Sequence, residues 1–283
     1  MNSKVVVIKP GFYTSVQDSG RFDYLLYGVP ISGCMDKKSA KIANAILNNK
    51  NDCALLEMTV SGGHFLFKAN TNICITGADM MPQINKIPVK MNTAIAIQKD
   101  DELVMHHSKN GCRTYLSITG GFQTPKVLNS RSMYKGITEN FRLSKNDELY
   151  FISTSKPIKS NATIKNVRIE SQQQVIDVYK GPEFDQLTDK QIEILAFTLF
   201  TISNESNRMA YPLTEFIPNH LDPIITSIVL PGTVQLTPGG KLIILMRDCQ
   251  VTGGYPRILQ LTEGAIDALA QQQVNNQIQF NLL

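Results

Sequence analysis

The stretch Gly28-Val29-Pro30-Ile31-Ser32-Gly33-Cys34-Met35-Asp36 decides the interpretation of this sequence, because a loop rich in glycine and proline changes there into a helical pattern. Aspartate is a favoured N-cap residue, and Asp36 precedes the change. Residues at a spacing of 3.6 then form one face, with lysines on the other. The positions on that face are Ser39, Ala43, Ile46 and Leu47. The sequence therefore predicts a helix that begins just after Asp36.

The start of such a helix offers unpaired N–H groups and a partial positive charge to whatever the preceding loop holds. A carboxylate, a phosphate or an amide oxygen would fit there. The same residues are also compatible with a simple connection in which Asp36 only caps the helix. Upstream, Asp18 and Arg21 flank Gly20 and could form either a surface turn or a substrate clamp.

Composition narrows the classes of function. The chain has 283 residues, enough for one large domain or two ordinary ones, and its net charge of +4 is spread without a basic block. This pattern argues against nucleic-acid binding. We find no apolar run long enough for a membrane helix and no signal-peptide pattern, so we expect a cytoplasmic protein without a membrane segment.

Cysteines and histidines give no sign of a metal centre. The five cysteines include no C-x-x-C pair, and the four histidines lack the spacings of a metal site. We therefore expect no disulfide framework and no bound metal.

Most of the sequence is typical of short strands separated by turns, which favours a mainly β fold. Expected strands include residues 4–8, 63–68, 72–76, 93–97, 102–106, 113–119, 175–179, 203–209, 233–237, 241–246, 258–262 and 277–281. Two further helices are expected near Asp189–Phe200 and Ala265–Gln272. A polar stretch between Ser153 and Val167 is the best candidate for a linker, which predicts two domains, 1–155 and 156–283.

Several motifs, taken together and in order, resemble the A/B-type carboxyltransferase family. This family includes the carboxyltransferase domain of urea carboxylase, subunit 2 of allophanate hydrolase and the C subunit of bacterial 5-oxoprolinase. The motifs that carry the resemblance are Val16 to Arg21, Gly28 to Asp36, Ala43-Asn44, Leu56-Glu57, Thr76 to Asp79, Tyr115 to Gly121, Ser130 to Ser132, Arg208-Met209, Gly232 to Gln235 and Thr252 to Pro256.

The resemblance implies two tandem cyclophilin-like β-barrels with a few short helices. It also implies a smaller partner subunit of related fold and a small-molecule amide substrate. One branch of the family opens 5-oxoproline to glutamate with ATP, which would be bound together with partner subunits. Another transfers a carboxyl group from carboxybiotin to urea, so biotin belongs only to that alternative.

The resemblance further implies a pocket that holds an anion and positions an amide. The expected catalytic residues are Asp18, Asp36, Glu57 and Asp79. The expected substrate- or anion-binding residues are Arg21, Gly33, Asn44, Arg131, Arg208, Gln235, Thr252, Gly253 and Tyr255. For Glu57 and Asp79, a second interpretation is a carboxylate satisfied by backbone N–H groups at a strand end.

The chain departs from the family pattern at several positions, and at four of them, Phe141, Asn207, Pro212 and Cys249, a charged group that is usual in the family is lost. The departures are Asn129, Met133, Asn140, Phe141, Asn207, Pro212 and Cys249. The leading hypothesis is the larger subunit of an ATP-dependent 5-oxoprolinase. The alternatives are a biotin-dependent carboxyltransferase subunit and a non-catalytic protein that binds and antagonises a kinase inhibitor, which the lost charges favour.

Overall fold

The structure, a computed structural model, describes residues 3–154 and 173–283. The chain forms two compact units: unit 1 comprises Met1–Arg21 and Ser32–Ile169, and unit 2 comprises Phe22–Ile31 and Glu170–Leu283. The segment Phe22–Ile31 therefore belongs to unit 2, although it lies in the first half of the sequence. The predicted boundary at residue 155 and nearly all of the predicted linker 153–167 lie outside the described residues, so this boundary stays a prediction.

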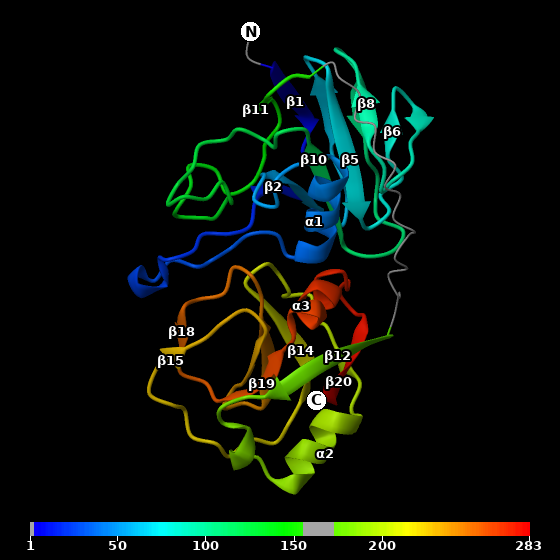
Figure 1. Cartoon of the computed structure of the whole chain (residues 1–283). Helices are drawn as coiled ribbons and strands as arrows, with labels where there is room; N and C mark the ends of the chain where they lie inside the picture. Colours follow the sequence, from blue (N-terminus) through cyan, green and yellow to red (C-terminus); the bar gives the residue numbers. More distant parts are fainter. Residues whose placement is uncertain (1–2, 155–172) are drawn as a thin grey trace. The chain divides into compact units, whose positions relative to one another are not determined.

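Unit 1 contains two antiparallel sheets, visible in the upper part of Figure 1. The first has the order β11-β1-β4-β9-β6-β7, with β11 (Glu148–Phe151), β1 (Ser3–Lys9), β4 (His64–Phe67), β9 (Glu102–Val104), β6 (Gln83–Ile84) and β7 (Ile87–Pro88). The second has the order β2-β3-β10-β5-β8, with β2 (Tyr13–Gln17), β3 (Leu55–Thr59), β10 (Arg113–Ile118), β5 (Thr71–Gly77) and β8 (Ile95–Ile97).

The core of unit 1 lies between these two sheets. In β1, Val5 and Val7 are fully buried while their neighbours are not, the alternation expected of a strand with one face inward. These valines belong to the same hydrophobic cluster as Leu56 of β3 and Leu116 of β10. Burial of both inner faces in one cluster gives the unit its barrel-like form.

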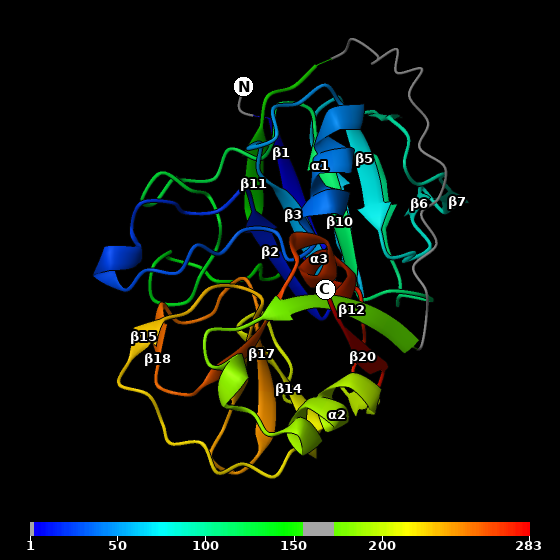
Figure 2. The ribbon, with the colours of Figure 1, turned by 60° about the horizontal axis from the view of Figure 1, so that its bottom comes forward.

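Helix α1 (Lys37–Ile46) covers the outer face of the second sheet and explains why β10 is buried along its whole length. Its buried face includes Ala43 and Ile46, which pack with Cys74 of β5 and Tyr115 of β10. Both ribbon views show the helix against this sheet (Figures 1 and 2). The helix begins where the sequence predicts, after the N-cap Asp36.

Unit 2 is built around a seven-stranded sheet of order β13-β20-β12-β19-β16-β17-β14, in which only the β12–β20 pair is parallel. The strands are β13 (Phe200–Thr201), β20 (Gln277–Leu282), β12 (Gln173–Lys180), β19 (Arg257–Leu261), β16 (Thr233–Leu236), β17 (Lys241–Leu245) and β14 (Ala210–Phe216). A short second sheet pairs β15 (Ser227–Ile228) with β18 (Thr252–Gly253). The 3-10 helix η1 (Leu25–Tyr27) also belongs to this unit, and η2 (Phe184–Gln186) precedes α2.

Two helices pack on the large sheet of unit 2. Helix α2 (Asp189–Phe197) contacts β20 and begins with a capping box between Thr188 and Gln191. Helix α3 (Glu263–Ala270) contacts β12 and β19, and the Thr262 side chain caps it. The sequence predicts both helices: α2 begins at the expected residue and ends three residues earlier, and α3 begins and ends two residues earlier than expected.

One expected strand is wrong. Residues 203–209 form a turn, and the strand β14 starts at Ala210. The reason is local, because the Asn207 carboxamide oxygen accepts hydrogen bonds from the backbone N–H groups of Met209 (2.8 Å) and Ala210 (3.4 Å). Asparagine side chains of this kind compete with strand pairing.

The predicted fold class, mainly β with barrel-like sheets and a few short helices, is confirmed. Strands form most of the regular structure of the described residues, which contain three α-helices. None of the helices in these residues is long and apolar enough to cross a membrane.

Candidate functional site

Asp18 is the centre of a buried polar cluster in unit 1. Its Oδ1 accepts hydrogen bonds from Gly20 N–H (2.9 Å) and from the Ser130 and Ser132 hydroxyls (both 2.7 Å). Its Oδ2 accepts one from Arg131 N–H (2.6 Å). Four donors therefore hold this carboxylate, which fixes the loop 130–132 against the end of β2. This geometry favours a positioning role for Asp18, and its expected catalytic role stays a prediction.

Two arginines, Arg21 and Arg131, bind groups of this part of unit 1. The Arg21 side chain is fully buried and donates to the carbonyl oxygens of Val127 (3.2 Å) and Ser132 (2.7 Å). Arg131 is only half-buried, and its guanidinium donates to the side-chain oxygen of Gln123 (2.9 Å). Of the two arginines, Arg131 is the one that a ligand could reach.

Gly33 fits the glycine loop against the Asp18 segment. Its φ is +87°, and a Cβ there would lie 3.1 Å from backbone atoms of Asp18, Ser19 and Gly20. Beside it, Cys34 N–H donates to the Asp18 carbonyl oxygen (3.2 Å). The two predicted site motifs, residues 17–21 and 28–36, are therefore brought together at this point.

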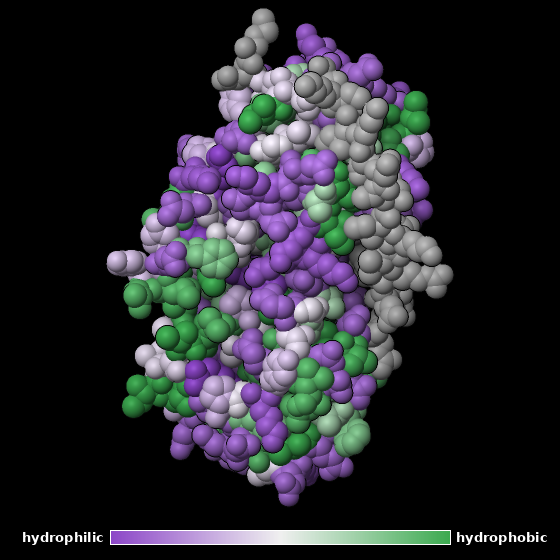
Figure 3. All heavy atoms as spheres, in the orientation of Figure 1, coloured by the Kyte–Doolittle hydropathy of each residue, from purple (hydrophilic) through white to green (hydrophobic). Residues whose placement is uncertain are grey.

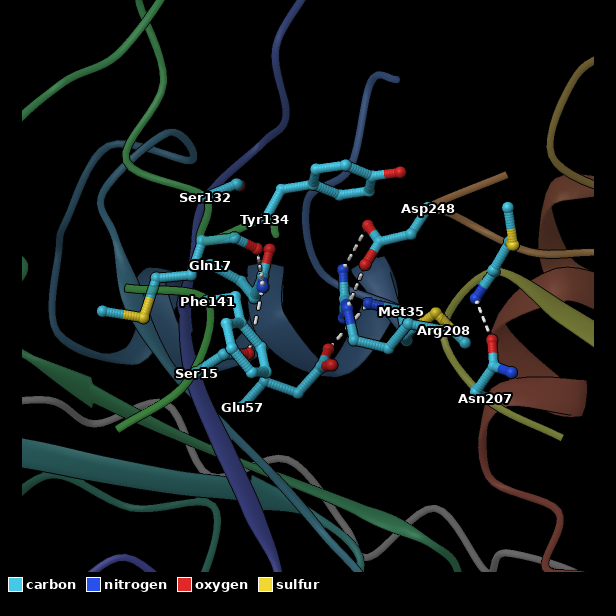
Figure 4. A network of polar contacts seen from close by, with 12 residues as sticks. Ser15, Gln17, Met35, Glu57, Ser132, Tyr134, Phe141, Asn207, Arg208 and Asp248 are labelled. Carbon is cyan, nitrogen blue, oxygen red and sulfur yellow. Dashed lines mark hydrogen bonds and ion pairs between the residues drawn. The ribbon is translucent and has the colours of Figure 1, made fainter. Parts of the chain in front are cut away.

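The start of α1 receives groups from the protein itself. Met35 N–H donates to Glu57 Oε2 (2.7 Å), as Figure 4 shows, and Asp36 N–H donates to the Tyr115 hydroxyl (2.7 Å). Tyr115 in turn donates to the same Glu57 oxygen (2.9 Å), and Arg113 Nε lies 3.8 Å from Glu57 Oε1. The anion expected at this position is thus the chain's own carboxylate, in line with the second interpretation of Glu57.

Tyr115 is fully buried between these groups. Its burial, together with the nearby carboxyl groups of Glu57 and Asp36, raises the pKa of Tyr115 well above its ordinary value. The phenol therefore stays protonated and serves as a fixed hydrogen-bond donor to Glu57.

The other two expected catalytic carboxylates of unit 1 accept hydrogen bonds from neighbouring residues of the chain. Asp36 caps α1, with Oδ1 accepting from Ser39 N–H (2.9 Å) and Oδ2 from the Ser39 hydroxyl (2.6 Å). Asp79 is exposed, follows β5 and accepts from Met81 N–H (2.8 Å). It does not join the Asp18 or Glu57 clusters.

Asn44 connects the far end of α1 to the second sheet. Its amide donates to the Cys53 carbonyl oxygen (2.9 Å), and its side-chain oxygen accepts from the Ser117 hydroxyl (2.5 Å). Asn44 is almost fully buried, so its hydrogen bonds hold the helix on β10.

In unit 2, Arg208 forms a buried bidentate ion pair with Asp248. Arg208 Nε lies 2.8 Å from Asp248 Oδ2, and Nη2 lies 3.0 Å from Oδ1, as drawn in Figure 4. This is the fork geometry in which arginine binds carboxylates. An incoming anion would have to compete with Asp248 for this guanidinium.

The remaining predicted residues of unit 2 lie around β16 and β18. Gln235 of β16 is buried, and its amide nitrogen lies 3.5 Å from the Tyr255 carbonyl oxygen. A Cβ on Gly253 would lie 2.6 Å from the same nitrogen, so a larger residue there would have to displace the Gln235 amide. Thr252 and Tyr255 are exposed, which leaves them open to a ligand.

Several buried side-chain polar atoms of unit 1 have no hydrogen-bond partner among the described atoms of the protein, and two of them belong to the segments that meet at Gly33. These two are Gln17 Oε1 and Ser32 Oγ, and both side chains are fully buried. Each belongs to one of the two segments that meet at Gly33. Such atoms are costly to leave unsatisfied, and an amide ligand offers both a donor and an acceptor.

The described residues do not fit a nucleotide triphosphate. The described arginines of unit 2 are paired with carboxylates: Arg208 with Asp248, Arg247 with Glu263 and Asp267, and Arg257 with Glu183. The start of α1 is filled by Glu57 and Tyr115. This part of the chain alone therefore offers no obvious triphosphate site.

One cavity of about 330 Å³ lies in unit 2, beside the first turns of α2. Thr188, Lys190, Pro218 and His220 are among its lining residues. None of the predicted site residues lines it.

Several residues of these clusters had no role assigned from the sequence. Ser130 and Ser132 flank Arg131 and bind Asp18, while Tyr115 and Arg113 reach Glu57. The alternation of Arg113 and Tyr115 on one strand was the only local signal. Their partners lie far away in the sequence, so the pairing itself could not be predicted.

The departures from the family pattern occupy ordinary structural positions. Asn207 organises the turn before β14, and Pro212 sits where the β14–β17 register shifts. Cys249 is buried, which raises the pKa of its thiol to about 12. Phe141 stacks under Arg142, whose guanidinium carbon lies 5.5 Å from the ring centre.

Comparison with known proteins identifies the family. The family described as carboxyltransferase domain, subdomain A and B, matches residues 27–282. The chain belongs to this family. It is 29% identical to the C subunit of 5-oxoprolinase from Escherichia coli over 279 residues, which cover 97% of this chain and 89% of that protein. The urea amidolyase of Lachancea kluyveri is 40% identical, but over 45% of this chain and 7% of that protein.

Solved structures share the fold of this carboxyltransferase-family chain. The Kluyveromyces lactis urea carboxylase matches with a TM-score of 0.86 and 26% identity, covering 99% of this chain and 27% of that one. The protein TTHA0988 matches with a TM-score of 0.87 and 20% identity, covering 99% of this chain and 55% of that one. This chain therefore spans about a quarter of the Kluyveromyces lactis protein and about half of TTHA0988.

Proposed function

We propose that this chain is the larger subunit of an ATP-dependent 5-oxoprolinase-type amidohydrolase, which opens 5-oxoproline to glutamate together with a smaller partner subunit. The observation that carries the proposal is the match to the C subunit of the E. coli 5-oxoprolinase, because it extends over nearly the whole of both chains. A second relative of that name, from Haemophilus influenzae, is matched over 94% of this chain and 87% of that protein at 29% identity.

The chemistry of unit 1 is compatible with an amide that carries a carboxylate. In our proposal, Arg131 binds the carboxylate of 5-oxoproline, because it is the accessible arginine beside the Asp18 cluster. Asp18 holds Arg131 by its backbone and so fixes where the guanidinium begins.

In this proposal, ATP binds to the partner subunits. Because the described residues of this chain do not fit a triphosphate, we assign the phosphate-binding groups to those subunits and derive no step through ATP. The role of this chain is then to bind and orient the amide.

The test is glutamate release from 5-oxoproline with ATP, using this chain reconstituted with the subunits encoded beside it. We expect turnover by the complex, and a loss of about 10-fold or more in kcat/KM for Arg131→Ala, since a charged hydrogen bond to substrate is worth about 1.5–3 kcal/mol. Arg142→Ala is the matched control, because Arg142 is exposed and stacks on Phe141. It should leave kcat/KM unchanged.

Other outcomes would favour the alternatives. Turnover of urea with carboxybiotin would support a carboxyltransferase, for which the match to urea carboxylase at 26% identity is the specific observation. A complex that assembles and turns over neither substrate would favour a binding protein, consistent with the carboxylate already bound to Arg208.

A further inference from the structure

Three segments of unit 2 are almost free of charge. They are Phe22–Ile31, residues 223–231 and residues 250–256, and Asp23 is the only charged residue among them. Charged residues make up 18% of the whole chain, so the depletion is marked. Depletion of charge is the compositional sign of the core of a protein–protein interface.

Two of these segments, Phe22–Ile31 and residues 223–231, also expose large apolar side chains. Leu26 and Ile225 are each 95% exposed, and Phe22, Tyr27, Ile228 and Leu230 are between 46% and 78% exposed. We call these six residues the apolar face. Single exposed apolar residues are common, but a group of this kind calls for a partner surface.

The three segments lie side by side. Strand β15 pairs with β18, which joins Ile228 to Thr252, and Ile224 N–H donates to the Gly254 carbonyl oxygen (2.9 Å). Both ribbon views place η1 next to this small sheet (Figures 1 and 2). In Figure 3, apolar surface gathers at the left, over η1 and over the β15–β18 segments.

The size of the apolar face matches a specific interface. A fully exposed large side chain presents about 150–250 Å². At their observed exposures, the six side chains present on the order of 800 Å², close to the ~800 Å² that each partner contributes to a standard interface. The absence of lysine and arginine from the three segments argues against an anionic membrane surface.

We propose that the apolar face is the docking surface for the smaller partner subunit, whose matching face is apolar and uncharged. The identity of this occupant rests on the proposed function. It is supported by the relatives, since the E. coli protein is named as one subunit of a 5-oxoprolinase and a little under half of the TTHA0988 chain lies outside the match. Thr252 and Tyr255 lie in the third segment, so docking would bring the partner next to predicted substrate-binding residues.

The experiment measures binding of the smaller subunit encoded beside this chain by calorimetry, to the whole chain and to Leu26→Asp and Ile225→Asp. Both side chains are almost fully exposed, so the variants should fold, which circular dichroism and thermal unfolding will check. We expect each substitution to weaken binding by about 30-fold or more, as at an interface hot spot. Phe197→Asp is the control, because Phe197 is 76% exposed but lies at the end of α2, outside the apolar face. It should bind normally.

Three results would overturn the proposal: no binding by the wild-type chain, unchanged binding by both variants, or a dimer of this chain in light scattering that Leu26→Asp and Ile225→Asp dissociate. The last result would assign the face to a second copy. If the variants lose the partner as expected but the wild-type complex releases no glutamate, the docking surface stands and the proposed activity fails.

Discussion

At the scale of single residues, the Asp18 carboxylate joins parts of the chain that are remote in sequence. Three of its four donors come from Ser130, Arg131 and Ser132, which lie 112 to 114 positions later. The cluster joins residues 130–132 to the end of β2, where Arg21 also donates to the Ser132 carbonyl oxygen. A carboxylate that already accepts four hydrogen bonds is better suited to hold a site than to take a proton from a substrate.

Replacing Asp18 with asparagine should therefore destabilise the protein. The two serine hydroxyls can rotate to suit an amide, but Arg131 N–H cannot, so one buried donor loses its charged acceptor. We expect the free energy of unfolding in urea to fall by about 2 kcal/mol. Asp79→Asn, at an exposed carboxylate, should change it by less than about 0.5 kcal/mol. A fully stable Asp18→Asn protein that has lost 5-oxoproline turnover would instead support a catalytic Asp18.

At the scale of elements, the sequence is most informative where structure is local. It predicts Asp36 as a helix cap, and Asp36 caps α1 through Ser39, three residues away. It predicts a strand over residues 241–246, which form β17 (Lys241–Leu245). The prediction fails for residues 203–209 because the turn depends on the orientation of one side chain, Asn207, which a pattern of residue types does not specify.

The clusters of the candidate site are only partly predictable for the same reason. The order of the motifs along the chain indicates Asp18, Arg131 and Glu57 as expected site residues. The pairing of Glu57 with Tyr115, 58 positions later, and of Arg208 with Asp248, 40 positions later, depends on which strands become neighbours. Strand order of that kind is set by packing of the whole unit, and local patterns leave it open.

The cap of α1 gives a test at this scale. Asp36→Ala removes both hydrogen bonds to Ser39, and we expect the free energy of unfolding to fall by about 1 kcal/mol. Asp36→Ser keeps an N-cap oxygen and should recover most of this loss. Chemical denaturation followed by circular dichroism measures both. If Asp36→Ser restored stability but the complex still failed to open 5-oxoproline, the Asp36 carboxylate would have a role beyond capping.

At the scale of the whole molecule, each of the two units has a hydrophobic core of its own. Val5 and Phe65 are buried in the core of unit 1, and Val178 and Ile244 are buried in the core of unit 2. Units of this kind can unfold in separate steps, so a single midpoint would not describe the molecule. Hydrogen exchange, which reports on each segment, is the suitable measurement.

The Arg257–Glu183 pair should make the stability of unit 2 depend on acid. Arg257 donates to Glu183 from Nε (3.0 Å), Nη2 (2.8 Å) and the backbone N–H (2.8 Å). Chiefly through the side-chain bonds, and against the opposing effect of burial, the pKa of Glu183 is lowered from its ordinary value of 4.5. Because the folded pKa lies below the unfolded one, the stabilisation is fully present above about pH 4.5 and is lost as the pH falls through the folded value.

Glu183→Gln should consequently lower the free energy of opening in unit 2 by about 2 kcal/mol at pH 7. This difference from the wild type should shrink as the pH falls below 4.5, since the wild-type carboxyl then becomes neutral as well. The hydrogen-exchange rates of the β19 amides measure this difference in the free energy of opening. The exchange rates of the β10 amides in unit 1 should not change. Glu205→Gln is the control, because its pair with Lys241 is at the surface, with Glu205 66% exposed, and such pairs contribute little. A gap that stayed constant down to about pH 3 would show that the glutamine variant had disturbed packing, and that the charge of Glu183 was not the source of the stability.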